Sequence, residues 1–401
     1  MPNPRISRRM AKPDFPGEFV DAMLKAATVP NLISFGGGFP NPIAFPIEDF
    51  RAAADKVLRE KGITALQYHA TAGYAPLREY IAKRYFRLGV DVKADEVVIT
   101  NGSQQCLDMI AACLLDPGDE VVMEKPTYLV ALQTFHLYEP RILSVDLNED
   151  GIDTGKLRKV LDEHDPKFLY VVPDFQNPTG LTYSEEKRKT VADMIRLRGR
   201  SMFIVEDEAY AELRFRGEQN YSFGHYLPEQ TLMVGTFSKV ISPGVRIGWV
   251  VCKDSILLER LLAYKQIMDL HTNIFSQMVI AEYLNTHDLE EHTARIKELY
   301  QHQADVMVEC IEKYMPEGTT YTRPDGGMFM WVTLPEGVAA VDVQYAAIPK
   351  GVLICAGDPF YETERNVRSM RINFTNSSDE IIEKGVKRLA EAAKEVMARK
   401  K

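Results

Sequence analysis

Six short runs of mostly apolar residues constrain the fold of this chain more than any other feature of its sequence. They are rich in Val, Ile and Phe, and they comprise Val97–Thr100, Glu120–Glu124, Phe168–Pro173, Phe203–Glu206, Leu232–Gly235 and Gly248–Cys252. Because apolar and polar residues do not alternate along them, the runs are typical of strands buried on both faces of a mostly parallel sheet. Helix-length amphipathic stretches separate them, so we expect an α/β domain with helices on both faces of the sheet.

Helix signals between the runs agree with this pattern. Thr182 and Glu185 have the spacing of a capping box ahead of an amphipathic stretch. Ser103 opens a segment of good helix formers that extends to Leu115. The middle of the chain therefore has the βαβ pattern.

The two ends of the chain have a different pattern. Residues 287–315 are predicted to form one long amphipathic helix, and residues 379–398 a final helix after several short apolar segments. The first 50 residues are rich in Gly and Pro and must pack on another part of the chain. We therefore expect a smaller α+β domain built from both ends: residues 1–50 as an N-terminal arm and part of this domain, 51–290 as the large domain, and 291–401 as a linking helix and small C-terminal domain.

Composition excludes several classes of protein. The 57 acidic and 48 basic residues give a net charge of −9, which argues against a nucleic-acid-binding protein. The five cysteines form no C-x-x-C pair, which favours reduced thiols over a disulfide framework or a zinc site. We find neither a secretory signal nor an apolar run long enough to cross a membrane, and we expect a soluble cytoplasmic protein without a bound metal.

Polar residues follow the predicted strands, at the edge where α/β sheets bind their ligands. Lys239 comes just after one run, with the hydroxyls of Thr236 and Ser238 before it and Arg246 after it. The hydroxyls and the arginine could hold a phosphate, which would leave the lysine amine free as a nucleophile. The alternative is an ordinary surface turn.

Three further groups lie at the same edge. Asp207 ends a run, so it needs a cationic or hydrogen-bonding partner, or else it caps the next helix. Asn177 lies in an Asn-Pro-Thr-Gly sequence, which is a turn signal. Ser103 and Gln104 begin a predicted helix, where free N–H groups favour an anion. A phosphate site, a lysine, an aspartate and an amide together match the requirements of pyridoxal 5′-phosphate, which has an aldehyde, a phosphate and a basic ring nitrogen.

Several longer motifs place the chain near a known family. They are Ile33–Pro40, Tyr68 with Gly73–Glu79, Thr100–Gln105, Asn177–Gly180, Asp207–Tyr210, Ser238–Lys239 and Arg371–Phe374. With this combination, from about Leu32 to the C-terminus, the chain resembles the fold-type I pyridoxal-phosphate aminotransferases of class I/II. Within them it is most similar to the 2-aminoadipate/kynurenine-type branch. The resemblance implies a seven-stranded sheet in a large cofactor-binding domain.

The resemblance also implies the role of each site residue. Lys239 would form the Schiff base and carry the proton, Asp207 would pair with the ring nitrogen, and Tyr210 would assist as the third catalytic residue. The cofactor phosphate and ring would contact a larger set: Ser103, Gln104, Tyr128, Asn177, Tyr210, Thr236, Ser238 and Arg246. Tyr68 would reach the cofactor phosphate of a partner subunit, which implies a homodimer with shared active sites. The substrate would contact Gly38, Asn177 and Arg371, with the arginine binding its α-carboxylate.

The expected reaction moves the amino group of an L-amino acid to a 2-oxo acid, with 2-oxoglutarate as the expected acceptor and a ping-pong mechanism. Two alternatives remain open. One is a pyridoxal-phosphate-dependent C–S β-lyase on the same fold. The other is a cofactor-sensing regulatory module, although only about 30 residues precede Leu32, fewer than a DNA-binding domain needs. The sequence does not rank 2-aminoadipate, aromatic, branched-chain and glutamate donors.

Overall fold

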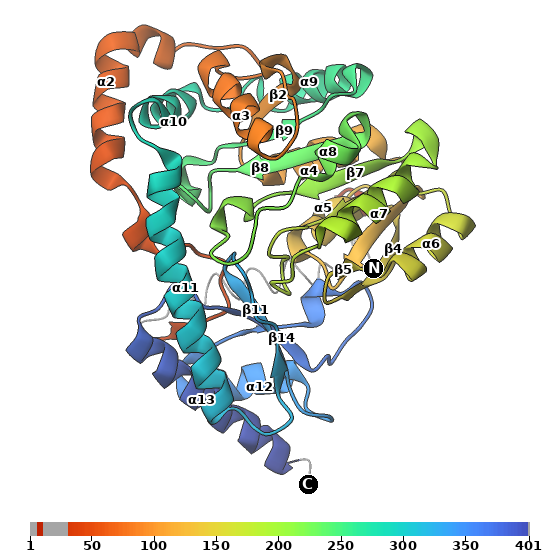
Figure 1. Cartoon of the computed structure of the whole chain (residues 1–401), viewed down its shortest axis with the longest axis vertical. Coiled ribbons are helices and arrows are strands. Elements are labelled where there is room, and N and C mark those ends of the chain that lie inside the picture. Colours follow the sequence, from red (N-terminus) through yellow and green to blue (C-terminus); the bar gives the residue numbers. More distant parts are fainter. Residues whose placement is uncertain (1–5, 11–30, 400–401) are drawn as a thin grey trace.

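The fold is seen in a computed structural model that describes residues 6–10 and 31–399 (Figure 1). Half of the predicted N-terminal arm, residues 1–5 and 11–30, lies outside the described residues. Within the described ranges, no helix is both long and apolar enough to span a bilayer.

The large sheet has eight strands, one more than predicted. Their order across the sheet is β2 (Val97–Thr100), β9 (Gly248–Val251), β8 (Thr231–Thr236), β7 (Phe203–Asp207), β6 (Phe168–Val171), β3 (Glu120–Lys125), β4 (Arg141–Asn148) and β5 (Gly151–Ile152). From β8 to β4 neighbouring strands are parallel, whereas β9 is antiparallel to both of its neighbours. All six predicted runs are strands of this sheet. Strands β4 and β5 lie outside those runs, and the two-residue β5 pairs with the end of β4 across a tight turn.

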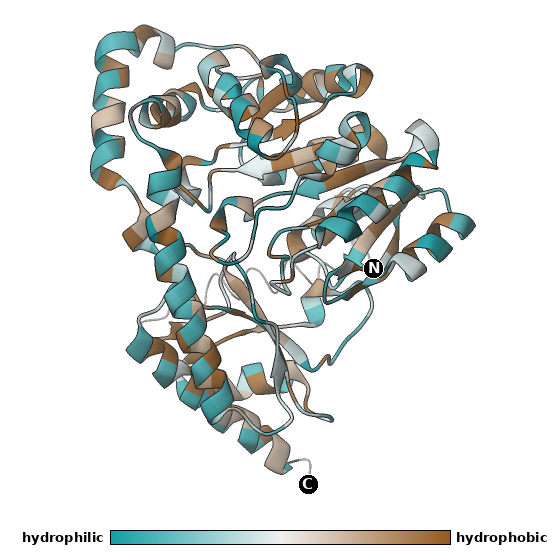
Figure 2. Ribbon diagram, in the orientation of Figure 1, coloured by the Kyte–Doolittle hydropathy of each residue, from teal (hydrophilic) through white to brown (hydrophobic). Residues whose placement is uncertain are grey.

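Helices cover both faces of the sheet, as predicted. The side chains of Val121 and Met123 pack in one cluster with α4 (Ser103–Leu114) and α5 (Leu129–His136). Val122, between them, packs in a second cluster with α6 (Thr154–Glu163), α7 (Glu185–Arg196) and α8 (Phe223–Tyr226). Adjacent residues of a strand point to opposite faces, so a strand covered on both faces is mostly apolar. In Figure 2 the outer sides of α6 and α7 are mainly hydrophilic.

The N-terminus of α7 differs in detail from the prediction. Ser184 is the N-cap, and its hydroxyl accepts a hydrogen bond from the backbone N–H of Lys187. Thr182, the predicted cap, lies two residues earlier, and its hydroxyl accepts a hydrogen bond from the N–H of Phe175. Both residues have the hydroxyl that a cap requires, so local sequence alone did not separate them.

Four further helices lie in the upper part of Figure 1. They are α2 (Ile47–Ala65), α3 (Ala75–Arg87), α9 (Ser255–Asp269) and α10 (Ile274–Thr286). Helix α2, the outermost of them, packs on α10, and α9 packs on α4. Residue 50, the predicted end of the arm, lies in the first turn of α2.

Strand β1 (Ile33–Ser34) and the C-terminal third of the chain contribute to the lower part of the molecule (Figure 1). Helix α11 (Leu289–Tyr314) leads into it, as predicted, and is followed by β10 (Thr320–Tyr321), β11 (Phe329–Thr333), α12 (Ala340–Ala347), β12 (Val352–Leu353), β13 (Cys355–Ala356), β14 (Ser369–Asn373) and α13 (Asp379–Arg399). Strands β10, β11, β14 and β13 form an antiparallel sheet. Strand β1 (Ile33–Ser34) pairs in parallel with β12, which joins residues from the two ends of the chain.

Candidate functional site

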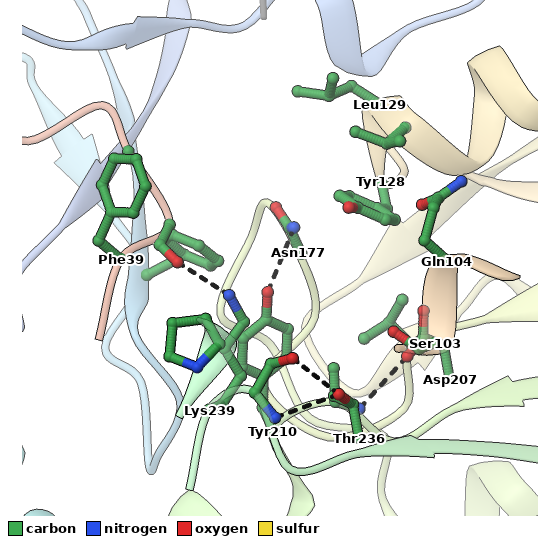
Figure 3. Close-up of a pocket in the computed structure, with 18 of the residues that line it drawn as sticks. Phe39, Ser103, Gln104, Tyr128, Leu129, Asn177, Asp207, Tyr210, Thr236 and Lys239 are labelled. Atoms are coloured by element: carbon green, nitrogen blue, oxygen red, sulfur yellow. Dashed lines mark hydrogen bonds between the residues drawn. The ribbon is translucent and has the colours of Figure 1, made fainter. Parts of the chain in front are cut away.

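A cavity of about 290 Å³ lies where the large sheet meets the lower sheet. Every predicted site residue except Tyr68 lines it. They are Gly38, Ser103, Gln104, Tyr128, Asn177, Asp207, Tyr210, Thr236, Ser238, Lys239, Arg246 and Arg371. Most of them follow the carboxyl ends of β2, β3, β6, β7 and β8, because parallel strands bring those ends to one edge. Figure 3 shows Tyr128 and Phe39 facing the cavity from opposite sides.

The amine of Lys239 points into this cavity and has a lowered pKa. Lys239 lies just after β8, and its Nζ donates a hydrogen bond of 2.8 Å to the carbonyl oxygen of Gly38 (Figure 3). Burial lowers the pKa of Lys239 to about 8, and the positive charges of Arg371 and Arg246 act in the same direction. Part of the amine is therefore neutral near physiological pH, as a nucleophile or a base must be.

Asp207 is a buried carboxyl group at the carboxyl end of β7. It is 4% exposed and accepts hydrogen bonds from the hydroxyl of Tyr170 at 2.9 Å and from the N–H of Ala209 at 3.3 Å. Burial raises the pKa of Asp207 to about 6, although the bond from Tyr170 opposes this. A cation in the cavity would stabilise its ionised form. Tyr170 was not predicted as a site residue, because its contact depends on β6 and β7 being neighbours.

Five residues line one end of the cavity and, with the neighbouring Gly102, form an anion cradle: Ser103, Gln104, Thr236, Ser238 and Arg246. Gly102 has a φ of 75°, and a Cβ there would lie 2.4 Å from Nη2 of Arg246, so a side chain at this position would displace the guanidinium from the cradle. Ser103 is the first residue of α4, whose N-terminal N–H groups favour an anion. Together with the Arg246 guanidinium and three hydroxyls, this donor set fits a phosphate group.

Two members of the cradle have defined contacts of their own. The side-chain amide of Gln104 donates to the hydroxyl of Thr134, which leaves its backbone N–H as the group directed to a ligand. The hydroxyl of Thr236 donates to that of Ser238 at 2.9 Å (Figure 3). Gln104 is thus expected to contact a phosphate through its main chain.

Asn177 and Tyr210 meet on one side of the cavity. The Nδ2 atom of Asn177 lies 3.4 Å from the hydroxyl of Tyr210, to which it donates (Figure 3). Both residues are almost fully buried. Their amide and hydroxyl could share a ligand oxygen atom placed beside them, since each carries a donor.

Arg371 brings a guanidinium from β14 into the same cavity. It is 7% exposed, and its Nη1 and Nη2 donate to Oδ1 of Asn177 and to the carbonyl oxygen of Gly36, both at 2.8 Å. Its buried Nε finds no acceptor among the described residues. An unpaired buried donor of this kind is costly, and a ligand carboxylate would satisfy it. The guanidinium carbon lies 4.2 Å from the centre of the Phe329 ring.

Tyr68 does not line the cavity of its own chain. It lies after α2, is 78% exposed, and touches the ring of His271 edge-on with 6.0 Å between ring centres. Its predicted role concerns a partner subunit, which a single chain does not test.

Sequence reasoning missed the apolar wall of the cavity. The additional lining residues are Gly36, Gly37, Phe39, Leu129, Val130, Val172, Ala209, Pro243, Phe329 and Cys355. Phe39 and Phe329 lie within segments that the sequence singled out, a glycine-rich motif and an apolar run. However, neither pattern indicates which side chains of a segment face a ligand.

Comparisons with known proteins agree with this geometry. The sequence model of the aminotransferase class I and II family matches residues 38–389. Aromatic-amino-acid aminotransferase 1 of Thermococcus litoralis is 37% identical over 94% of this chain and 91% of its own length. The 2-aminoadipate transaminase of Thermus thermophilus is 38% identical over 94% of each chain. The crystal structure of LysN, an alpha-aminoadipate aminotransferase from Thermus thermophilus with bound N-(5'-phosphopyridoxyl)-L-leucine, is similar with a TM-score of 0.89 at 36% identity, covering 98% of this chain and all of the other.

Proposed function

Because the chain belongs to the class I and II aminotransferases and is a pyridoxal-phosphate-dependent transaminase, we propose that the cavity around Lys239 is its active site. One observation carries this assignment. An amine of lowered pKa shares a buried cavity with an aspartate, an anion cradle and an arginine that has an unpaired Nε. The two relatives at 37% and 38% identity are aminotransferases, so neither the β-lyase nor the regulatory alternative is favoured.

The donors and acceptors of the cavity fit pyridoxal 5′-phosphate. When bound, the cofactor supplies the electron sink for chemistry at the substrate Cα. Asp207 holds a proton on the ring nitrogen, and Asn177 and Tyr210 hydrogen-bond the ring oxygen. Tyr128 packs on the ring. The phosphate is held by Ser103, Gln104, Thr236, Ser238 and Arg246, the members of the anion cradle that bear a donor.

The substrate is held by the opposite wall of the cavity. Arg371 binds the α-carboxylate through its Nε and one terminal nitrogen, a planar pair of donors that lysine does not have. Gly38, whose carbonyl accepts from Lys239, and Asn177, whose Oδ1 accepts from Arg371, line the same cavity and complete the proposed substrate site. With the carboxylate fixed, Lys239 moves the proton at the substrate Cα, which favours proton transfer over loss of the carboxylate. The amino group is then passed to a 2-oxo acid, which we propose to be 2-oxoglutarate.

Two half-reactions studied separately test this function. The purified protein should absorb visible light through the bound cofactor, and an amino donor alone should shift that absorption and release one 2-oxo acid per site. Borohydride reduction should attach the cofactor to Lys239. Attachment to another lysine, or a requirement for both substrates before any product forms, would contradict the proposal.

We also propose a homodimer in which Tyr68 completes the partner's phosphate site. Exposed apolar residues around Tyr68 support this. Ile63 and Leu66 precede Tyr68 in sequence, and Ile267, Met268 and Leu270 precede His271, whose ring Tyr68 contacts. Apolar patches of this kind mark interaction surfaces. Mixing Tyr68→Ala and Lys239→Ala subunits should restore activity, because one site of each hybrid dimer would then be intact. Without shared sites, mixing would restore nothing.

The proposal also covers the cellular location and the domain boundaries. The five cysteines are all free, which is consistent with a protein of the reducing cytoplasm, where we place it. We keep the division into residues 1–50, 51–290 and 291–401 as a proposal for the domains. Limited proteolysis of the full chain, with mapping of the first cuts, tests these boundaries.

A further inference from the structure

A buried ion pair lies behind the loop that carries the anion cradle. Lys265, in α9, is 0% exposed. Its Nζ donates to both carboxylate oxygens of Asp269, at 2.9 and 2.8 Å, and to the hydroxyl of Thr272 at 2.9 Å. None of these residues lines the cavity. Burying a charged pair of this kind costs desolvation energy, so its presence here calls for a structural reason.

The carboxylate of the pair holds the loop between β2 and α4. Oδ2 of Asp269 accepts from Nδ2 of Asn101 at 2.6 Å and from Nε2 of Gln105 at 2.9 Å. Oε1 of Gln105 in turn accepts from the backbone N–H of Asn101 at 2.8 Å and from Lys265 at 3.3 Å. Asp269 therefore holds the side chain of Asn101 directly. The main chain of Asn101 is held by Gln105, which the ion pair itself binds.

The fixed loop is the one that presents the cradle. Asn101 directly precedes Gly102 and Ser103, and its carbonyl oxygen accepts from Nη2 of Arg246 at 3.3 Å. The hydroxyl of Thr272 also donates to the carbonyl oxygen of Ile99 in β2. A shift of Asn101 would consequently move the helix N-terminus and the guanidinium of the cradle together.

We propose that Lys265 and Asp269 are positioning residues for the cofactor phosphate. They act through Asn101 and Gln105 and touch neither cofactor nor substrate. Preorganised donors bind an anion more tightly than donors that must be ordered at binding, so the ion pair contributes to phosphate affinity without contacting it. The inference rests on the proposed assignment of the cradle to the phosphate.

The test compares two ligands that differ only in the phosphate. Dissociation constants of the apoenzyme for pyridoxal 5′-phosphate and for pyridoxal are measured by fluorescence quenching, and their ratio isolates the phosphate contribution. Both ligands carry the same aldehyde, so bonding to Lys239 cancels in this ratio. Lys265→Met should reduce the preference for the phosphorylated ligand about tenfold, the effect of about one lost hydrogen bond to a charged group.

Lys253→Met is the matched control. Lys253 is a mostly buried lysine paired with Glu96 at 3.2 Å, at the opposite end of β2. Its loss should leave the ratio unchanged. If Lys265→Met does not fold, Asp269→Asn, at a more exposed position, should likewise reduce the preference for the phosphorylated ligand.

The outcomes separate this inference from the proposed function. A folded Lys265→Met or Asp269→Asn protein that keeps the wild-type ratio overturns the positioning role, while the active site stands. A wild-type apoenzyme with equal affinity for both ligands overturns the phosphate assignment, and the positioning role with it.

Discussion

Nη1 of Arg371 donates a hydrogen bond of 2.8 Å to Oδ1 of Asn177, and this bond joins β14 to the loop after β6 inside the cavity. The same guanidinium is bonded to the carbonyl of Gly36, in the segment that follows β1. Three segments far apart in sequence therefore meet at one side chain. The substrate site exists only when the two sheets are packed together.

Replacement of Arg371 by lysine should impair substrate binding more than the chemical step. Lysine keeps the charge but loses the planar pair of donors, so the KM for the amino donor should rise about 100-fold. Steady-state kinetics with saturating acceptor measure this change. Arg368→Lys is the control, because Arg368 precedes β14 and donates to the carbonyl of Leu334 instead of facing the cavity. An equal effect of both variants would contradict the role of Arg371.

Replacement of Gly102 by alanine should weaken cofactor binding. The new Cβ would lie 2.4 Å from Arg246, and the residue would also keep a φ of 75°, which strains alanine. The affinity of the apoenzyme for pyridoxal 5′-phosphate, measured by fluorescence titration, should fall about 100-fold.

Gly118→Ala separates the two causes. Gly118 has a φ of 95°, but nothing lies within 4 Å of a Cβ at that position. This variant should lose about 1 kcal/mol of stability and no cofactor affinity. If it lost affinity as well, backbone strain and not the clash with Arg246 would explain Gly102→Ala.

The stability of the apoenzyme should depend on Asp207 at mildly acidic pH. Burial raises the pKa of folded Asp207 to about 6 from an ordinary value of 3.8, so between these values the folded state binds more protons than the unfolded state. The free energy of unfolding should therefore fall as pH rises through this window, by on the order of 2 kcal/mol.

Urea unfolding at several pH values measures this dependence. Asp207→Asn removes the titrating group. The difference in free energy of unfolding between wild type and variant should therefore change across the window from about pH 4 to 6. In the holoenzyme the cationic ring nitrogen stabilises the carboxylate, and the dependence should shrink. A constant difference in the apoenzyme would show that folded Asp207 titrates normally.

Glu124 should matter for both stability and substrate binding. Its buried carboxylate accepts from Nε2 of Gln176 at 2.9 Å, from the hydroxyl of Tyr183 at 2.8 Å and from the N–H of Val172. Glu124→Leu leaves these donors unpaired and should lower the free energy of unfolding by about 2–4 kcal/mol. Because Gln176 precedes Asn177, the KM for the donor should rise too.

Tyr183→Phe is the control for Glu124. It removes one donor to the carboxylate and leaves the bond from Gln176 in place. Tyr183→Phe should therefore lower the free energy of unfolding by about 1 kcal/mol and leave the KM for the amino donor unchanged. A rise in KM with Tyr183→Phe would mean that the effect of Glu124→Leu reflects general destabilisation.

The sequence alone determined most of the large sheet and the polar residues at its edge. Strands buried on both faces have few polar positions, so each appears as a mostly apolar run that can be recognised locally. Strand β4 was not among the predicted runs, because it mixes buried and exposed residues. Strand β5, with two residues, was too short to leave a pattern.

Tertiary structure decided how the site residues act on one another. The bonds of Lys239 to Gly38, Tyr170 to Asp207 and Arg371 to Asn177 join residues that are far apart in the chain. No local pattern encodes such pairs, because each depends on which strands become neighbours and how the two sheets pack. The lowered pKa of Lys239 and the ion pair behind the cradle have the same origin, since burial and charge depend on the surrounding chain rather than on adjacent residues.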